Sequence, residues 1–292
     1  MKTARPISRF ICPMALLLIL LSCDSLIIER FYQNGVVASA SPIATDIGLT
    51  ILEADGNAVD AAIAVGFALA VCYPEAGNIG GGGFALLYLD SSREVRALDF
   101  RETAPGGAHG DMFLDKNGNI IPEKSLTGAA AAGVPGTVAG LYHLWNEFGS
   151  KPWPELLEPA ISLADTGFIV DGYLADKLGQ YKEELSFFPE TGSIFLKSGN
   201  PYKAGERLIQ KALANTLGRI AIDAERGFYE GKTAELIVET MNRHGGIIDY
   251  DDLKSYQPVW RQPVTFDFDS LTVFSMPPPS SGGAIMLSLI HI

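Results

Sequence analysis

The segment that most restricts the fold of this chain is residues 58–72, in which every side chain is small or apolar except that of Asp60. A surface helix has one apolar stripe, whereas a helix that is apolar on all sides must lie inside a core. Asn57 stands directly before the segment and can cap a helix. The segment is also shorter than the roughly 20 apolar residues of a bilayer-spanning helix. The pattern therefore predicts a core helix over Ala58–Cys72.

Composition agrees with a large folded core. The chain has 292 residues, of which 47% are apolar, enough for one large domain or two modest ones. The formal net charge is -12 at pH 7. Such an acidic surface repels phosphate backbones, so nucleic acid is not expected as a partner.

Helix and strand signals alternate on both sides of the core helix. A helix is predicted from Pro42 to Ala54, with Ser41 as its cap, and another from a Thr137 cap through Phe148. From Pro152 to about His244 the apolar spacing is helical. Strands are predicted at Phe84–Leu89, Val95–Phe100, Val264–Phe268 and Leu271–Ser275, the first two joined by a turn at Asp90–Arg93. This order indicates a mixed α/β (α+β) fold.

The glycine run Gly80–Gly83 does not fit a dinucleotide-binding loop. Such a loop lies between a strand and a following helix, because the pyrophosphate binds at the N-terminus of that helix. Here the run follows a predicted helix and precedes a predicted strand. We interpret it as a segment whose missing side chains let two backbones approach closely.

The N-terminus has the pattern of an export signal. Basic residues precede an apolar run from Ile11 to Leu21, and Ser22 and Cys23 follow. The run resembles a bacterial lipobox, so we expect residues 1–22 to be a signal peptide, Cys23 to be lipidated and residues 23–40 to form a linker. The protein would then be exported, periplasmic or at the cell surface, and held to a membrane by its lipid. An ordinary cleaved signal with a cysteine at its boundary is the alternative.

The remaining reactive residues do not form a cofactor or metal site. Cys72 would have no partner for a disulfide and is expected to be a small buried residue. The four histidines are far apart and show no metal-ligand spacing. The sequence has no GxSxG, HExxH or GxxxxGK[ST] motif. We therefore expect neither a cofactor nor a metal.

Arg101 is the strongest binding candidate that the residues themselves provide. It directly follows the predicted strand that ends at Phe100. A guanidinium at a strand end can bind a carboxylate through two parallel hydrogen bonds. The other interpretation is a structural salt bridge to Asp99, Glu102 or a distant acid.

Five segments in this order resemble the γ-glutamyltranspeptidase family. They are Gly56–Ala62, Ala76–Phe84, Asp99–Pro105, Gly133–Gly140 and Met276–Gly283. The resemblance as a whole covers essentially residues 35 to 285. The resemblance implies an N-terminal-nucleophile hydrolase fold, an αββα sandwich that is incomplete in this chain. It also implies a precursor that cuts itself into a large and a small subunit and exposes a threonine nucleophile. Residues 35–285 would be the large-subunit portion.

The resemblance also implies the substrate and its binding residues. Family members cleave γ-glutamyl amides such as glutathione and pass the γ-glutamyl group to water, amino acids or peptides through a threonyl acyl-enzyme. The family's arginine that holds the substrate's α-carboxylate corresponds to Arg101, and Glu102 corresponds, with less weight, to its neighbour. No cofactor is implied.

The nucleophile of such an enzyme should lie beyond Met276–Gly283. We therefore expect the chain as given to be truncated and inactive, with its small subunit missing. Residues 287–292 match a sequencing-library transposon end translated in frame, so an artefact is expected there. Two alternatives stay open: a related acylase with another acyl group, such as a β-lactam side-chain acylase or a capsule transpeptidase, and a non-catalytic binding lipoprotein.

Overall fold

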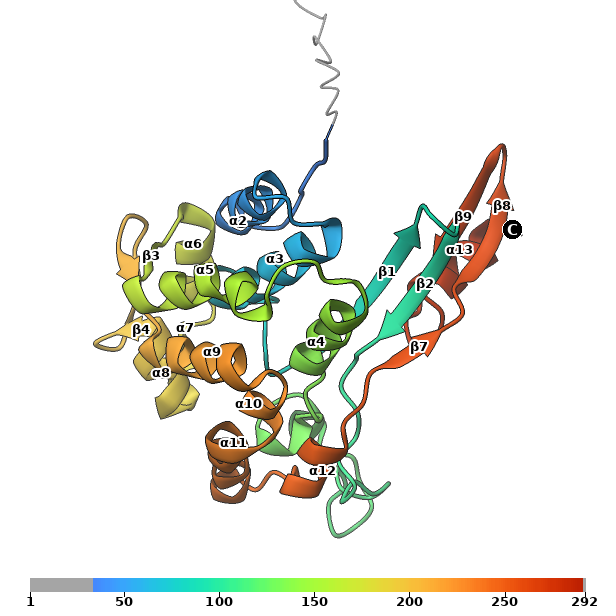
Figure 1. Cartoon of the computed structure of the whole chain (residues 1–292). Helices are drawn as coiled ribbons and strands as arrows, with labels where there is room; N and C mark the ends of the chain where they lie inside the picture. The colour runs from blue at the N-terminus through green and yellow to red at the C-terminus, as the bar shows by residue number, and fades with distance from the viewer. Residues whose placement is uncertain (1–33, 291–292) are drawn as a thin grey trace, which may run out of the picture. The chain divides into compact units, whose positions relative to one another are not determined.

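The computed structural model describes residues 34–290. The chain divides into one unit of Met1–Val36 and another of Val37–Ile292, and the elements drawn in Figure 1 belong to the second. The predicted signal peptide, the lipidation site Cys23 and most of the predicted linker lie outside the described residues. Within residues 34–290, no helix combines the length and apolar character needed to cross a bilayer.

The predicted core helix is present as α3 (Ala58–Cys72) and is buried along its length. Asn57 caps it: its side-chain oxygen accepts hydrogen bonds from the backbone amides of Val59 and Asp60. The preceding helix α2 (Pro42–Glu53) packs against α3 and has the predicted proline in its first turn. Both helices and the Asn57 cap are confirmed. Ser41 stands at the start of α2 but makes no capping hydrogen bond, and α2 ends one residue earlier than predicted.

Asp60 is the one charged residue of α3, and it is completely buried. Its carboxylate accepts hydrogen bonds from the amides of Asn57 (2.9 Å), Ser150 (3.0 Å) and Lys151 (3.3 Å), and from the Ser150 hydroxyl. Burial acts to raise the pKa of Asp60, but these hydrogen bonds outweigh it and lower the pKa. The carboxylate thus joins the start of α3 to the loop after α4.

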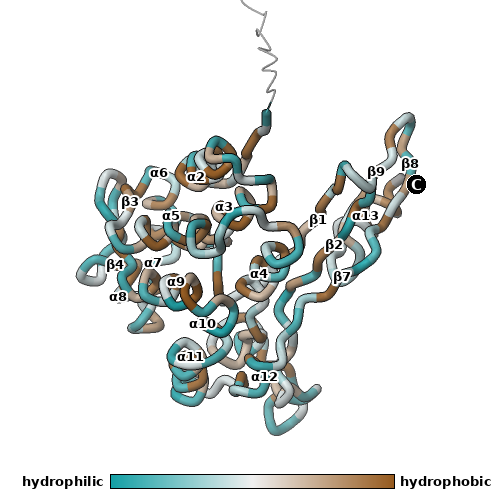
Figure 2. Tube along the Cα trace, in the orientation of Figure 1, coloured by the Kyte–Doolittle hydropathy of each residue, from teal (hydrophilic) through white to brown (hydrophobic). Residues whose placement is uncertain are grey.

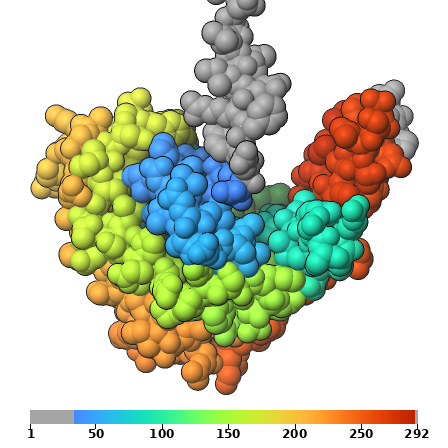
Figure 3. Space-filling view, turned by 45° about the horizontal axis from the view of Figure 1, so that its top comes forward, coloured from blue at the N-terminus to red at the C-terminus, as the bar shows by residue number. Residues whose placement is uncertain are grey.

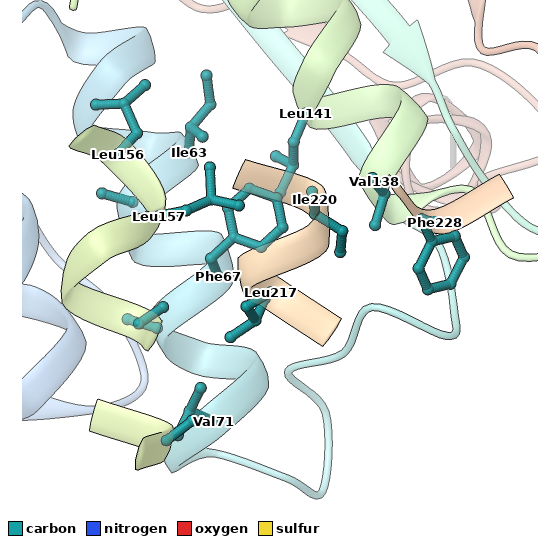
Figure 4. Packing of buried hydrophobic residues seen from close by; sticks show 14 of the residues in the cluster. Ile63, Phe67, Val71, Val138, Leu141, Leu156, Leu157, Leu217, Ile220 and Phe228 are labelled. Atoms are coloured by element: carbon teal, nitrogen blue, oxygen red, sulfur yellow. The ribbon is translucent and has the colours of Figure 1, made fainter. Parts of the chain in front are cut away.

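Helices from the middle of the chain surround α3. Phe67 of α3 lies between Leu157 of α5 (Trp153–Thr166) and Ile220 of α9 (Lys211–Asp223), as Figure 4 shows. Trp153 packs edge-on against Phe67, with ring centroids 5.6 Å apart. These side chains form a continuous apolar core.

The predicted helical region from Pro152 to His244 is confirmed in outline. It also contains two ribbons of two-residue strands, which sequence periodicity could not reveal because two residues carry no repeat. Its further elements are β3 (Phe168–Ile169), α6 (Gly172–Gln180), α7 (Lys182–Phe187), α8 (Pro189–Phe195), β4 (Leu196–Lys197), β5 (Asn200–Pro201), β6 (Arg207–Leu208), α10 (Arg226–Tyr229) and α11 (Gly231–His244).

A three-stranded antiparallel sheet lies beside the helices, in the order β1-β2-β7. Its strands are β1 (Phe84–Leu89), β2 (Glu94–Asp99) and β7 (Val259–Arg261). The first two confirm the predicted hairpin, although β2 begins and ends one residue earlier than predicted. Strand β7 was not predicted, since three residues are too few to establish an alternating pattern.

Helix α4 (Thr137–Phe148) covers one face of this sheet (Figure 1). On that face Glu147 accepts hydrogen bonds from Arg96 of β2 (2.9 Å) and Trp260 of β7 (2.7 Å). The prediction that Thr137 caps this helix is wrong. Gly136 occupies the cap position, and the Thr137 hydroxyl instead donates to Asn78.

The opposite face of the sheet is partly uncovered. Strand alternation and the β1-β2 register place Leu86 and Tyr88 on this face, and Val259 of β7 lies there too. Their side chains are 46%, 57% and 47% exposed. Figure 2 shows apolar residues, in brown, both in the helices and along β1. We name the set Leu86, Tyr88 and Val259 the open sheet face.

The last strands form the hairpin that the sequence predicts. They are β8 (Val264–Phe268) and β9 (Leu271–Ser275), and the helix α13 (Gly282–Ile290) packs against both. Figure 3 shows this C-terminal segment projecting beside β1 and β2. The remaining elements are the 3₁₀ turns Pro122–Ser125 and Ala129–Ala131 and the helix α12 (Tyr250–Ser255).

Asp60→Asn should lower the free energy of unfolding by about 1–3 kcal/mol, because the buried amide cannot satisfy the donors that the carboxylate accepts from. The loss should be present above the ordinary carboxyl pKa and should disappear as the pH falls through the lowered folded-state pKa, where the wild type loses the same charge. Urea unfolding of protein expressed from the full reading frame of the native locus measures both. Asp46→Asn, at an exposed position of α2, is the matched control and should have little effect.

Candidate functional site at the end of strand β2

Arg101 lies just beyond the end of β2, and its side chain is exposed. Its guanidinium forms no ion pair with any of the described residues. Its one hydrogen bond is a long one, 3.5 Å, to the backbone oxygen of Pro279. The alternative interpretation of Arg101 as part of a structural salt bridge is therefore wrong for residues 34–290, and the charged fork is available for a ligand.

The backbone of Arg101 is held firmly, in contrast to its side chain. Its amide donates to Asp99 Oδ1 (3.0 Å), and its carbonyl oxygen accepts from the hydroxyl of Tyr256 (2.9 Å). Gly82 packs closely against the same backbone segment. A Cβ at Gly82 would lie 2.5 Å from the oxygen of Phe100 and 2.8 Å from the Cα of Arg101. The guanidinium is thus carried by a backbone fixed from three directions.

Asp99 has a second partner in Arg261 of β7. Arg261 Nε lies 2.7 Å from Asp99 Oδ2, and the Asp99 side chain is only 8% exposed. Both carboxylate oxygens are therefore used, one by the Arg101 amide and the other by Arg261. This arrangement satisfies a charge that would be costly to bury alone.

Tyr256 connects Arg101 to the start of α4. Its ring stacks on that of Tyr229, with centroids 5.9 Å apart and planes 2° from parallel. The Tyr229 hydroxyl donates to the oxygen of Pro135 (2.8 Å) and accepts from the amide of Ala139 (3.3 Å). Burial raises the pKa of both tyrosines. Both hydroxyls therefore keep their protons and remain donors at neutral pH.

Other residues of the glycine run also hold the segment around Arg101 in place, through backbone hydrogen bonds. Gly81 accepts hydrogen bonds from the amides of Gly136 (2.7 Å) and Thr137 (3.1 Å), while its own amide donates to the Asn78 side chain (2.8 Å). Gly83 exchanges two backbone hydrogen bonds with Phe100. The predicted close backbone approach is confirmed at Gly82, whereas Gly80 has open space around it.

Glu102 is also exposed, and it forms no hydrogen bond or ion pair with Arg101. Its Cβ lies against Gly133, where an added Cβ would come within 2.8 Å. The bridge between Thr103 and Val134 then ties this segment to the loop before α4. Glu102 is thus placed beside Arg101 by its backbone, with its carboxylate directed by no partner among the described residues.

A mostly apolar pocket of about 390 Å³ opens next to this segment. Gly133 contributes to its wall, and α11 contributes Leu236 and Met241.

No group of three or more histidine, cysteine or acidic residues within residues 34–290 is arranged to hold a metal. Cys72 is buried, as predicted, and its thiol contacts the Ser41 hydroxyl (3.2 Å). Burial raises the pKa of this thiol.

Sequence reasoning identified Arg101 but missed the residues that hold it. Tyr256 and Arg261 are more than 150 positions away along the chain, in segments with no motif of their own. No local signal could connect them with Arg101, because the contacts arise only when β7 pairs with β2.

Comparison with known proteins places this arrangement in a family. The model of the family described as gamma-glutamyltranspeptidase matches residues 44–292. The chain belongs to the γ-glutamyltranspeptidase family. The resemblance seen in the sequence is therefore confirmed, and with it the mixed helix and strand content of a γ-glutamyltranspeptidase-like fold.

Individual relatives agree. A glutathione hydrolase proenzyme of Escherichia coli (strain K12) is 46% identical over 261 residues, which cover 89% of this chain and 45% of that protein. The crystal structure of the Helicobacter pylori γ-glutamyltranspeptidase matches with a TM-score of 0.87 and 44% identity, covering 89% of this chain and 75% of that chain. The Bacillus anthracis transpeptidase CapD matches with a TM-score of 0.72 and 35% identity, covering 86% and 79%.

The chain thus spans just under half the length of the curated relatives it matches. It corresponds to the N-terminal portion of a γ-glutamyltranspeptidase proenzyme. The predicted domain boundaries and the assigned roles of Arg101 and Glu102 stay predictions.

Gly82→Ala should destabilise the protein by about 2 kcal/mol or more, because the new methyl group meets only backbone atoms, which cannot turn aside. Gly80→Ala, two residues earlier in the same run, has nothing within 4 Å of the added Cβ and is the matched control. Thermal unfolding of both variants measures the difference. Equal melting temperatures would show that the close approach at Gly82 carries no constraint.

Proposed function

We propose that this chain is the substrate-binding, large-subunit portion of a glutathione hydrolase that acts on γ-glutamyl amides, and that Arg101 binds the α-carboxylate of the γ-glutamyl group. The observation that carries the proposal is the exposed guanidinium of Arg101, without an ion pair among the described residues, on a backbone held by Asp99, Tyr256 and Gly82. A guanidinium that has no ion-pair partner among the described residues, on a fixed backbone, is suited to form two parallel hydrogen bonds to a carboxylate. Glu102 is proposed as a secondary contact beside it.

The reaction would need a threonine hydroxyl from the remainder of the proenzyme. That hydroxyl attacks the γ-carbonyl of the substrate, the amide C–N bond breaks, the amine leaves with a proton, and a γ-glutamyl ester remains on the threonine. Water or the amine of an amino acid or peptide then takes the acyl group. An α-amine on the threonine itself has a pKa near 8 and can serve as the base. Arg101 would contribute by orienting the substrate.

The remainder of the proenzyme is also the partner that the open sheet face suits. Leu86, Tyr88 and Val259 expose apolar side chains over the sheet, and β1 is an edge strand among the described residues. A second sheet packed on this face would complete the αββα sandwich that the resemblance implies. The small subunit is proposed to supply that sheet.

Export through residues 1–22 and lipid anchoring at Cys23 are also proposed, from the sequence pattern. These residues lie outside the described part of the chain. Mass spectrometry of the mature protein from a bacterial host would detect the acyl groups on Cys23, and Cys23→Ser should release the protein from the membrane fraction.

Arg101→Ala should raise KM for a γ-glutamyl anilide by about 10- to 100-fold, because charged hydrogen bonds to the carboxylate are worth roughly 1.5–3 kcal/mol. Arg101→Lys keeps the charge without the fork and should fall in between. The enzyme is expressed from the full reading frame of the native locus. Arg226→Ala, at an exposed arginine that likewise forms no ion pair with a described residue, is the control.

The same experiment identifies the group that Arg101 recognises. A γ-aminobutyryl anilide is the same substrate without its α-carboxylate, and the wild type should strongly prefer the γ-glutamyl compound. Arg101→Ala should lose that preference. If the preference survived, Arg101 would not be the carboxylate-binding residue.

A second candidate keeps the fold and changes the acyl group, as in an acylase or another transpeptidase. The similarity to the transpeptidase CapD favours it, although the identity of 35% is lower than the 46% to the glutathione hydrolase proenzyme. It would be supported by an unchanged KM for the γ-glutamyl anilide in Arg101→Ala. A non-catalytic binding lipoprotein would instead bind γ-glutamyl compounds without turnover.

The open sheet face makes a prediction of its own. Expressed alone, residues 34–290 should aggregate, because apolar side chains and a strand edge are left uncovered. Leu86→Lys with Tyr88→Lys should reduce aggregation of this isolated chain but prevent assembly of the full proenzyme. Leu126→Lys, at a 79% exposed position outside the sheet, is the control and should change neither. Light scattering and size-exclusion chromatography measure both properties.

A further inference from the structure

The carboxylate of Asp99 poses a problem for the proposed role of Arg101. Asp99 is the last residue of β2 and lies two residues before Arg101. Asp99 is buried, and it already touches Arg101 through the backbone amide at 3.0 Å. A buried carboxylate without a counter-charge would attract the nearest cation. Arg101 is the arginine nearest to Asp99 along the chain, so its guanidinium is the candidate for such capture.

Arg261 occupies the position that resolves this problem. It reaches Asp99 from the neighbouring strand, where the register pairs Asp99 with Val259 and Ala97 with Arg261. Arg261 Nε contacts Asp99 Oδ2 at 2.7 Å, so the charge of Asp99 is balanced by a residue other than Arg101. The remaining oxygen, Oδ1, accepts from the backbone amide of Arg101 and not from its guanidinium.

We propose that Arg261 is a positioning residue for substrate binding: it neutralises Asp99, so that Asp99 holds the backbone of Arg101 without capturing its guanidinium. This inference rests on the proposed function of Arg101. It explains why a buried acid lies next to a substrate-binding arginine and yet forms its ion pair with a different arginine. A substrate carboxylate therefore meets a guanidinium that Asp99 does not compete for.

A simpler role for the same pair would be to fasten β7 to β2. The two roles predict different results for Asp99→Asn alone, which breaks the ion pair but leaves no buried acid. If the pair only fastens the strands, Asp99→Asn and Arg261→Gln should each lower the melting temperature and impair the enzyme, because each breaks the ion pair. If Arg261 shields Arg101 from Asp99, Asp99→Asn alone should leave KM near the wild-type value, and removing the charge of Asp99 should restore substrate binding in Arg261→Gln.

The experiment measures KM and kcat for a γ-glutamyl anilide in enzyme expressed from the full reading frame. Arg261→Gln should raise KM by about three- to tenfold with kcat nearly unchanged, as expected for loss of ground-state binding. Asp99→Asn with Arg261→Gln should return KM toward the wild-type value, since the substituted amide still offers an oxygen to the Arg101 backbone but carries no charge. Arg243→Gln breaks an exposed ion pair to Glu190 elsewhere and is the control.

The outcomes separate this inference from the proposed function. If Arg101→Ala raises KM but Arg261→Gln does not, or if the double variant is no better than the single one, the shielding role is wrong and the role of Arg101 stands. If Arg101→Ala itself leaves KM unchanged, the proposed function is wrong. Should Arg261→Gln fail to fold, Arg261→Met, which keeps the aliphatic stem, replaces it in both the single and the double variant.

Discussion

Burial of most of α3 is the constraint from which the rest of the described structure follows. A helix without a polar face cannot lie at a surface, so α2, α4, α5 and α9 must surround it. Its single charge, Asp60, is accepted in the core only because hydrogen bonds converge on it from the helix start and the loop after α4. The core is thereby joined to the helix that covers the sheet.

The glycine run connects the helical core to the candidate functional site. It leads from the end of α3 to β1, and Gly81 and Gly82 lie against the start of α4 and the end of β2. A side chain at Gly82 would collide with the backbone of the segment Phe100–Glu102, which follows β2 and carries Arg101. Close packing of backbones therefore replaces side-chain contacts next to Arg101, the residue proposed to bind the substrate.

Around Arg101, the residues that hold the backbone do not form an ion pair with the guanidinium. Asp99 and Tyr256 hold the backbone, whereas the guanidinium is left exposed and without an acidic partner among the described residues. Arg261 makes this separation possible because it balances the charge of Asp99 from a neighbouring strand. We propose that the open sheet face receives the rest of the proenzyme.

The sequence by itself determined the core helix, its Asn57 cap, the β1-β2 hairpin and the late hairpin, because each depends on residues close together in the chain. It also selected Arg101 as a binding candidate. It did not reveal Tyr256, Arg261 or β7, and it assigned Thr137 the wrong role as a cap. Those depend on contacts between segments separated by tens to more than a hundred residues. Only the tertiary structure decided that Asp99 pairs with Arg261 and not with Arg101, since that choice depends on which strand lies beside β2.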